Sequence, residues 1–151
     1  MNSHELNLEG RKRIEAELLK RGAASVTQTS RGGRRVYLLA TNSNHSRTVE
    51  LRIKTKQKGS WHATTDDATP TEAPPKPMDV KSYWVFVDFS SEPRYWIVPD
   101  WRIRNDIHNA HQKYLQKHGG HRAKNDDSNH HSIEESRLEQ WQDNWEILDI
   151  F

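Results

Sequence analysis

The chain has 151 residues, a length typical of a single domain, and its net charge is +2. Its six Trp, four Tyr and three Phe argue against disorder, and the absence of Cys excludes disulfides and Cys-ligated zinc. No stretch approaches the roughly 18 apolar residues of a membrane-spanning helix, and the N-terminus lacks the apolar core of a signal peptide. We therefore expect one soluble, cytoplasmic domain over residues 1–151, without a membrane partner.

The first half of the chain is predicted to hold a helix and three strands. The spacing of Ile14 and Leu18 indicates a helix over residues 10–21, and Gly22 is expected to cap its C-terminus. In the third predicted strand apolar and charged residues alternate, so we expect one buried face and one charged face. The three strands are predicted over residues 24–29, 34–41 and 47–56.

The middle of the chain is predicted to be a loop followed by two more strands. Residues 62–82 contain four Pro and are expected to form a flexible surface loop. Residues 83–89 are almost continuously apolar, which is typical of a buried central strand. Another strand is expected over residues 94–98, where Pro99 stops it.

The last part of the chain is predicted to be helical. A helix is expected over residues 101–117, with Asp100 as its N-cap. A final helix is expected to begin at Ser132 or Ile133 and to present an apolar stripe of Leu138, Trp141 and Trp145. The whole order predicts an α/β fold, with a mixed central sheet of about five strands flanked by helices.

Charge is divided unevenly along the chain. Residues 10–58 hold 13 Lys or Arg and only 3 acidic residues, whereas the remainder is acidic. A basic half suggests an anionic partner, and nucleic acid is the commonest one, because each neutralised phosphate releases a counterion. The alternative is that the acidic half neutralises the basic half within the fold.

Six segments together resemble a known family. They are residues 10–19 (GRKRIEAELL) with Gly22, 35–40 (RVYLLA), 49–55 (VELRIKT), 84–88 (WVFVD), 95–99 (YWIVP) and 141–148 (WQDNWEIL). In this order they resemble the PD-(D/E)XK nuclease-like fold, the restriction-endonuclease-like superfamily, and the later segments are similar to those of small bacterial members.

The chain departs from this family at the expected metal site. The resemblance implies an Asp on the second strand and Glu-x-Lys or Gln-x-Lys on the third, because two carboxylates hold Mg²⁺ beside the Lys. Here Tyr37 stands at the Asp position and Arg52 stands two residues before Lys54. Since neither replaces a carboxylate, we expect a catalytically degenerate nuclease-like protein that binds nucleic acid, DNA above all, without a cofactor. The residues expected to contact phosphates are Arg34, Arg35, Arg52, Lys54, Lys56 and Lys58.

Two other functions remain open at this point. The first is an active nuclease that uses Mg²⁺ or Mn²⁺ at a displaced site, in which Glu15 or Glu17 approaches Glu50 and Lys54 from the first helix. The second is a protein-interaction module, including a homodimer that neutralises the basic half.

Histidine and aromatic residues offer weaker signals. Six of the nine His lie between residues 108 and 131, a density that can bind Zn²⁺, Ni²⁺ or Mn²⁺. No familiar ligand spacing is present, so we interpret the segment as a polar loop and predict no metal site. Trp61, beside the basic strand, is the candidate for stacking on a base, although such a Trp is more often part of a core.

Overall fold

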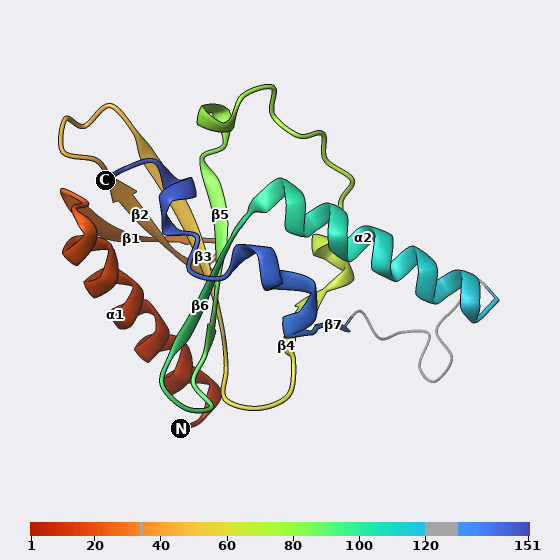
Figure 1. Ribbon diagram of the computed structural model, residues 1–151. Coiled ribbons are helices and arrows are strands. Elements are labelled where there is room, and N and C mark those ends of the chain that lie inside the picture. The colour runs from red at the N-terminus through yellow and green to blue at the C-terminus, as the bar shows by residue number, and fades with distance from the viewer. Residues whose placement is uncertain (34, 120–129) are drawn as a thin grey trace.

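The computed structural model describes residues 1–33, 35–119 and 130–151, and its main element is one mixed five-stranded sheet (Figure 1). The strand order is β1-β2-β3-β5-β6, in which only β3 and β5 are parallel neighbours. The α/β prediction with a mixed five-stranded sheet is therefore confirmed. The sheet strands are β1 (Ser25–Arg31), β2 (Arg35–Thr41), β3 (Thr48–Lys56), β5 (Ser82–Asp88) and β6 (Arg94–Pro99).

Helices and a small ribbon complete the fold. Helix α1 (Ser3–Arg21) precedes the sheet, and α2 (Asp100–Lys117) follows it. Strands β4 (Trp61–Thr64) and β7 (His130–Ile133) pair antiparallel in a separate two-stranded ribbon. Short 3-10 helices lie at Thr65–Asp67 (η1), Pro77–Asp79 (η2), Glu135–Trp141 (η3) and Trp145–Leu148 (η4).

The alternation of residues along the strands gives the sheet two different faces. One face carries Leu38, Leu51 and Val85 and is covered by Ile14 and Leu18 of α1, together with the C-terminal segment. The opposite face carries Trp84, Phe86 and Trp96 and is covered by Ile103 and Ile107 of α2 and by the β4–β7 ribbon. Burial of these side chains is the main source of stability. Figure 1 shows that the C-terminal part of α2 extends beyond the sheet.

Helix α1 is longer than the sequence pattern predicted. It begins at Ser3 because Asn2 and Glu5 form a capping box, in which each side chain accepts from the other residue's backbone N–H. Gly22 ends the helix as expected, with a φ of 120°. At Gly10 an added Cβ would lie 2.5 Å from the Thr55 side chain, so α1 packs closely against β3 there.

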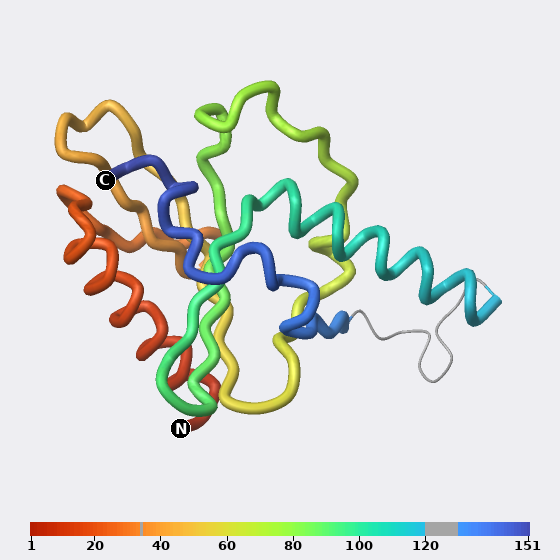
Figure 2. Tube along the Cα trace, viewed as in Figure 1, coloured from red at the N-terminus to blue at the C-terminus, as the bar shows by residue number. Residues whose placement is uncertain are grey.

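Three predictions about the connections are wrong. Residues 62–82 are not simply a loop, because they include most of β4 and both η1 and η2. The final helix does not form; β7 and two 3-10 helices take its place. Asp100 is the first residue of α2 rather than its N-cap, and its side chain bonds to Trp84 instead. Figure 2 shows that the chain arches away from the sheet after β4 before it enters β5.

In the described ranges, no helix is long and apolar enough to cross a membrane.

Candidate functional site

The polar side of β1, β2 and β3 forms a charged surface, which we call the charged half-face. It lies on the α2 side of the sheet, but α2 packs over β5 and β6 rather than over these three strands. Within it Arg31 and Arg35 are exposed, Lys54 and Glu50 are half-buried, and Arg52 is buried. Its residues are Arg31, Arg35, Tyr37, Glu50, Arg52 and Lys54.

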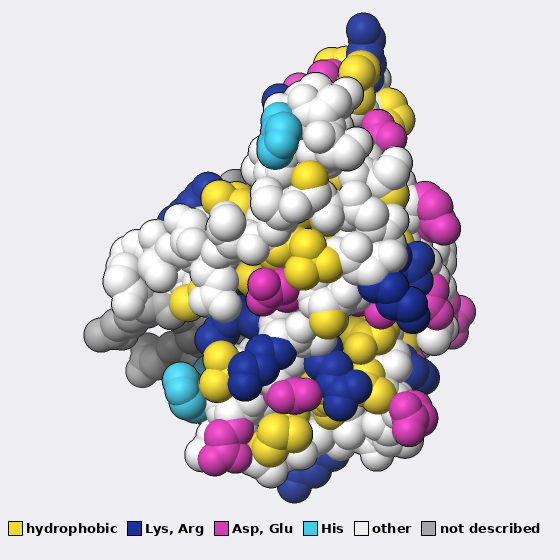
Figure 3. All heavy atoms as spheres, turned by 90° about the vertical axis from the view of Figure 1, so that its left-hand side faces the viewer, with side chains coloured by type: hydrophobic (Ala, Val, Ile, Leu, Met, Phe, Trp, Pro, Cys, Tyr) yellow, Lys and Arg dark blue, Asp and Glu magenta, His cyan; other side chains and the backbone are white. Residues whose placement is uncertain are grey.

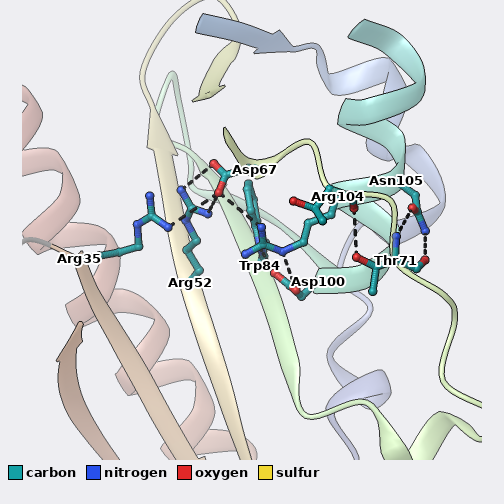
Figure 4. Close-up of polar contacts among 9 residues, drawn as sticks. Arg35, Arg52, Asp67, Thr71, Trp84, Asp100, Arg104 and Asn105 are labelled. Carbon is teal, nitrogen blue, oxygen red and sulfur yellow. Dashed lines mark hydrogen bonds and ion pairs between the residues drawn. The ribbon is translucent and has the colours of Figure 1, made fainter. Parts of the chain in front are cut away.

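A buried ion pair anchors this surface (Figure 4). Both terminal nitrogens of Arg52 donate to the carboxylate of Asp67 in η1, at 2.9 and 3.1 Å. The guanidinium of Arg52 also lies over the ring of Trp84, 4.1 Å from its centroid. A planar guanidinium can make both contacts at once, since the carboxylate lies in its plane and the indole against its face.

The network continues into α2. Arg104 lies 3.6 Å from Asp67 and donates to Asp100, and Asp100 accepts a hydrogen bond of 2.6 Å from the indole N–H of Trp84. Arg35 approaches Asp67 from the other side at 3.8 Å. Figure 4 shows the Asp67 carboxylate between these arginines. The network therefore fixes η1 and the start of α2 against β3.

The positive charges around Asp67 lower the pKa of its carboxyl by more than burial raises it. Burial alone would raise the pKa of its carboxyl, but the hydrogen bond from Arg52 and the positive charges of Arg52, Arg35 and Arg104 lower it below the usual value. Asp67 therefore stays ionised at neutral pH. Because its oxygens are bonded to Arg52, this carboxylate is used to hold the fold.

Lys54 lies in a different environment from the neighbouring arginines. In the described part of the chain, no carboxylate forms an ion pair with its ammonium, whose nearest aromatic contact is Trp84 at 5.8 Å. Burial and the charges of Arg52 and Arg35, opposed in part by Asp67, lower the pKa of Lys54 to about 8. It is still mostly protonated at pH 7, so the fold holds a half-buried cation that feels the charges of two other cations. Perturbed groups of this kind gather at functional sites.

The other residues predicted to contact phosphates differ in whether they already have partners within the fold. Lys56 lies on the same strand face as Arg52 and Lys54, but it contacts Asp88 at 3.7 Å and donates to the carbonyl of Gly59. Lys58 is exposed in the connection after β3. Arg34 lies outside the described residues. The predicted basic strip on β3 is therefore real, but two of its three members have internal partners.

The displaced nuclease site is not assembled in this structure. Glu15 and Glu17 lie on α1, which covers the face of the sheet opposite to the one that carries Glu50 and Lys54. Glu17 pairs with Arg21, and Glu50 pairs with Arg31. Residues 50 and 54 point away from α1 because side chains alternate along a strand. The four proposed catalytic residues thus fall on two sides of the sheet, which corrects that hypothesis.

Tyr37 and Arg52 are directly opposite one another on β2 and β3. Tyr37 is buried and lies beneath the guanidinium of Arg31, 5.1 Å from its ring centroid. Among the residues that the structure describes, no three His, Asp or Glu side chains are close enough to hold a metal ion.

Trp61 is a core residue. It is 1% exposed, its indole N–H donates to the carbonyl of Val87, and its ring packs edge-on against Phe86 and Trp96. Trp61 is therefore not exposed for stacking on a base, and its interpretation as part of a core is confirmed. Trp61 is the first residue of β4, and its side chain packs between the ribbon and the main sheet.

A cavity of about 660 Å³ lies between α2 and β7. Four histidines are among the residues that line it: His62, His111, His130 and His131. Burial and the nearby charge of Arg137 lower the pKa of His131 to about 4, so this imidazole is neutral at physiological pH. Arg137 contacts a ring nitrogen of His131 at 3.0 Å. His121 lies outside the described residues.

Sequence reasoning missed Asp67, Asp100 and Arg104 as parts of the site. Asp67 lay inside the predicted loop, and no periodic pattern pointed to it. The i,i+4 spacing of Asp100 and Arg104 was a visible signal for their own ion pair, but not for its contact with Trp84.

Comparisons with known proteins identified no match to this chain. No family model matches the chain, and no curated protein and no solved structure shows a significant match.

Proposed function

We propose that this protein binds the phosphate backbone of nucleic acid through the charged half-face. The observation that carries the proposal is the half-buried ammonium of Lys54, which lies two residues from Arg52 on β3, is repelled by the charges of Arg52 and Arg35, and forms no ion pair with a carboxylate of the described residues. Such an arrangement costs folding free energy. A bound phosphate would supply the missing negative charge.

The neighbouring side chains suit a backbone ligand. Arg35 and Lys58 are exposed and can reach an anion outside the sheet. Lysine and arginine contacts to phosphates position a duplex without reading its sequence. Duplex DNA is the ligand that we favour, because the chain resembles nucleases in the order of its segments.

The basic residues of α1 are poorer candidates. Arg13 pairs with Glu9 and Arg21 pairs with Glu17 along the helix. Figure 3, which views the side at the left of Figure 1, shows Lys and Arg side chains beside Asp and Glu side chains. Charge on this side is therefore largely balanced within the fold.

The test is fluorescence anisotropy of a labelled duplex across a salt series, with EDTA present. We expect affinity to fall steeply with salt, with a slope of about −0.9 per phosphate contact on a double-logarithmic plot. Lys54→Met and Arg35→Gln should each weaken binding and reduce the slope by about one. Lys20→Gln, on the far face of the sheet, is the matched control and should bind as the wild type does.

Two results would contradict the proposal. One is the absence of salt-dependent binding to duplex DNA at about 50 mM salt. The other is equal affinity of the Lys54→Met, Lys20→Gln and wild-type proteins, which would place any binding surface elsewhere.

A further inference from the structure

The two edges of the sheet differ in what covers them. Along β6, Trp96 is bridged to Gln142, and the N–H of Asp143 donates to the carbonyl of Tyr95. Along the outer side of β1, no described segment forms a backbone hydrogen bond. β1 reads SVTQTSR, without the Pro, Lys or bulge that commonly protects an edge. It is therefore an open strand that can accept another.

The hydrogen-bonding pattern shows which groups of β1 face outward. The N–H of Glu50 donates to Lys81 beside β5, so the even-numbered residues of β3 bond to β5 and the odd-numbered ones to β2. The odd-numbered residues of β3 are opposite the even-numbered residues of β2, so the odd-numbered residues of β2 bond to β1. These are opposite the odd-numbered residues of β1, which therefore bond to β2. The outward backbone groups are those of Val26, Gln28 and Ser30.

These outward groups match a second copy of the same strand. If Gln28 lies opposite Gln28 of another chain, Val26 lies opposite Ser30 in both directions, and all six outward N–H and carbonyl groups form hydrogen bonds. Arg31 then faces Ser25, so no two like charges are opposed. We propose that β1 pairs antiparallel with β1 of a second copy of this chain, and that duplex DNA brings the two copies together.

The second part of this proposal rests on the proposed function. A two-fold axis through Gln28 perpendicular to the sheet keeps both charged half-faces on the same side. Five strand spacings separate the two β3 strands. Gln28 of β1 aligns through Leu38 of β2 with Leu51 of β3, and Lys54 lies three residues beyond Leu51. On an untwisted sheet, the Cα atoms of the two Lys54 residues would therefore be about 30 Å apart. That distance is close to one turn of duplex DNA, about 34 Å, so both sites can meet phosphates on one side of a duplex.

The expected dimer is weak in the absence of DNA. Edge pairing of seven residues is a small contact beside the roughly 800 Å² per partner of a stable interface. Two protomers on one duplex gain affinity because the second contact is made at a high effective concentration.

Cross-linking tests the pairing without DNA. The chain has no Cys, so Gln28→Cys introduces a single thiol at the two-fold axis. Opposite residues there have Cα atoms about 5.5 Å apart, within the range of a disulfide. At millimolar concentration, we expect it to oxidise to dimer about tenfold faster than Ser43→Cys, a thiol in the exposed β2–β3 loop. Equal rates would overturn the pairing.

Stoichiometry tests the role of DNA. Gln28→Pro removes an outward N–H on an edge strand, where Pro is tolerated, and should leave the monomer folded, which urea unfolding will verify. By sedimentation velocity on a duplex of about two helical turns, we expect two copies of the wild type and one of Gln28→Pro. One wild-type copy at saturation would overturn assembly on DNA. If the wild type does not bind DNA at all, the proposed function fails as well, while cross-linking still decides whether β1 pairs.

Discussion

Replacing Lys54 by Met should make the protein more stable and a weaker binder of DNA. Met keeps most of the aliphatic stem that lies near Trp84, but it removes the ammonium held beside Arg35 and Arg52. The substitution therefore separates the free-energy cost of burying the charge from the stability contributed by packing of the aliphatic stem.

The magnitude follows from the pKa. Lowering the pKa of Lys54 from its ordinary 10.5 to about 8 corresponds to about 3 kcal/mol of unfavourable free energy when the folded state is protonated. Lys54 keeps some contact with water, which screens its charge, so we expect Lys54→Met to raise the free energy of unfolding by about 2 kcal/mol at pH 7. For a chain of this size that is a rise in Tm of about 4–8 °C.

The pH dependence gives an independent check. Because the folded pKa is lowered, the unfolded chain binds more protons between about pH 8 and pH 10.5, and wild-type stability should rise with pH in that window. Burial raises the pKa of Tyr83 and Tyr95, whose ionisation in the unfolded state opposes this gain above about pH 10. The measurement is urea unfolding followed by Trp fluorescence from pH 7 to pH 10. Lys54→Met should lose the rise that the wild type shows.

A specific result would refute this reasoning. If Lys54→Met lowers the free energy of unfolding, Lys54 stabilises the fold, and its lack of a carboxylate partner among the described residues has no functional meaning. Lys20→Gln serves again as the control, since this exposed residue of α1 lies on the other face and should change stability little.

Three further predictions concern the same surface. Arg52→Met should lower the free energy of unfolding by about 3 kcal/mol, because it leaves the buried carboxylate of Asp67 without its main partner, and adding Asp67→Asn should recover part of this loss in a urea double-mutant cycle. The folded-state pKa values of Asp67 and Asp88 lie below 3.8, so the stability these groups contribute is present above about pH 4 and is lost as pH falls further; Asp67→Asn should flatten this acid limb of the unfolding curve. DNA affinity measured by anisotropy should fall as pH rises through about 8, where Lys54 loses its proton, and should do so in Lys20→Gln but not in Lys54→Met.

The sequence by itself determined the sheet and the character of its third strand. Val49, Leu51 and Ile53 alternate with charged residues, and this period of two is sufficient to predict a strand with one buried and one charged face. The apolar run in β5 likewise predicted a central strand. These features are local, since each depends on residues a few positions apart.

Only the tertiary structure decided which charges act together. Asp67 reaches Arg52 because η1 folds back over β3, and β4 pairs with β7 across a long separation in sequence, so no local pattern encodes either contact. The same is true of Glu15 and Glu50, which the sequence placed in one hypothetical site and the sheet separates onto opposite faces. A cation such as Lys54 can be recognised in the sequence, but whether a carboxylate neutralises it depends on how distant segments pack around it.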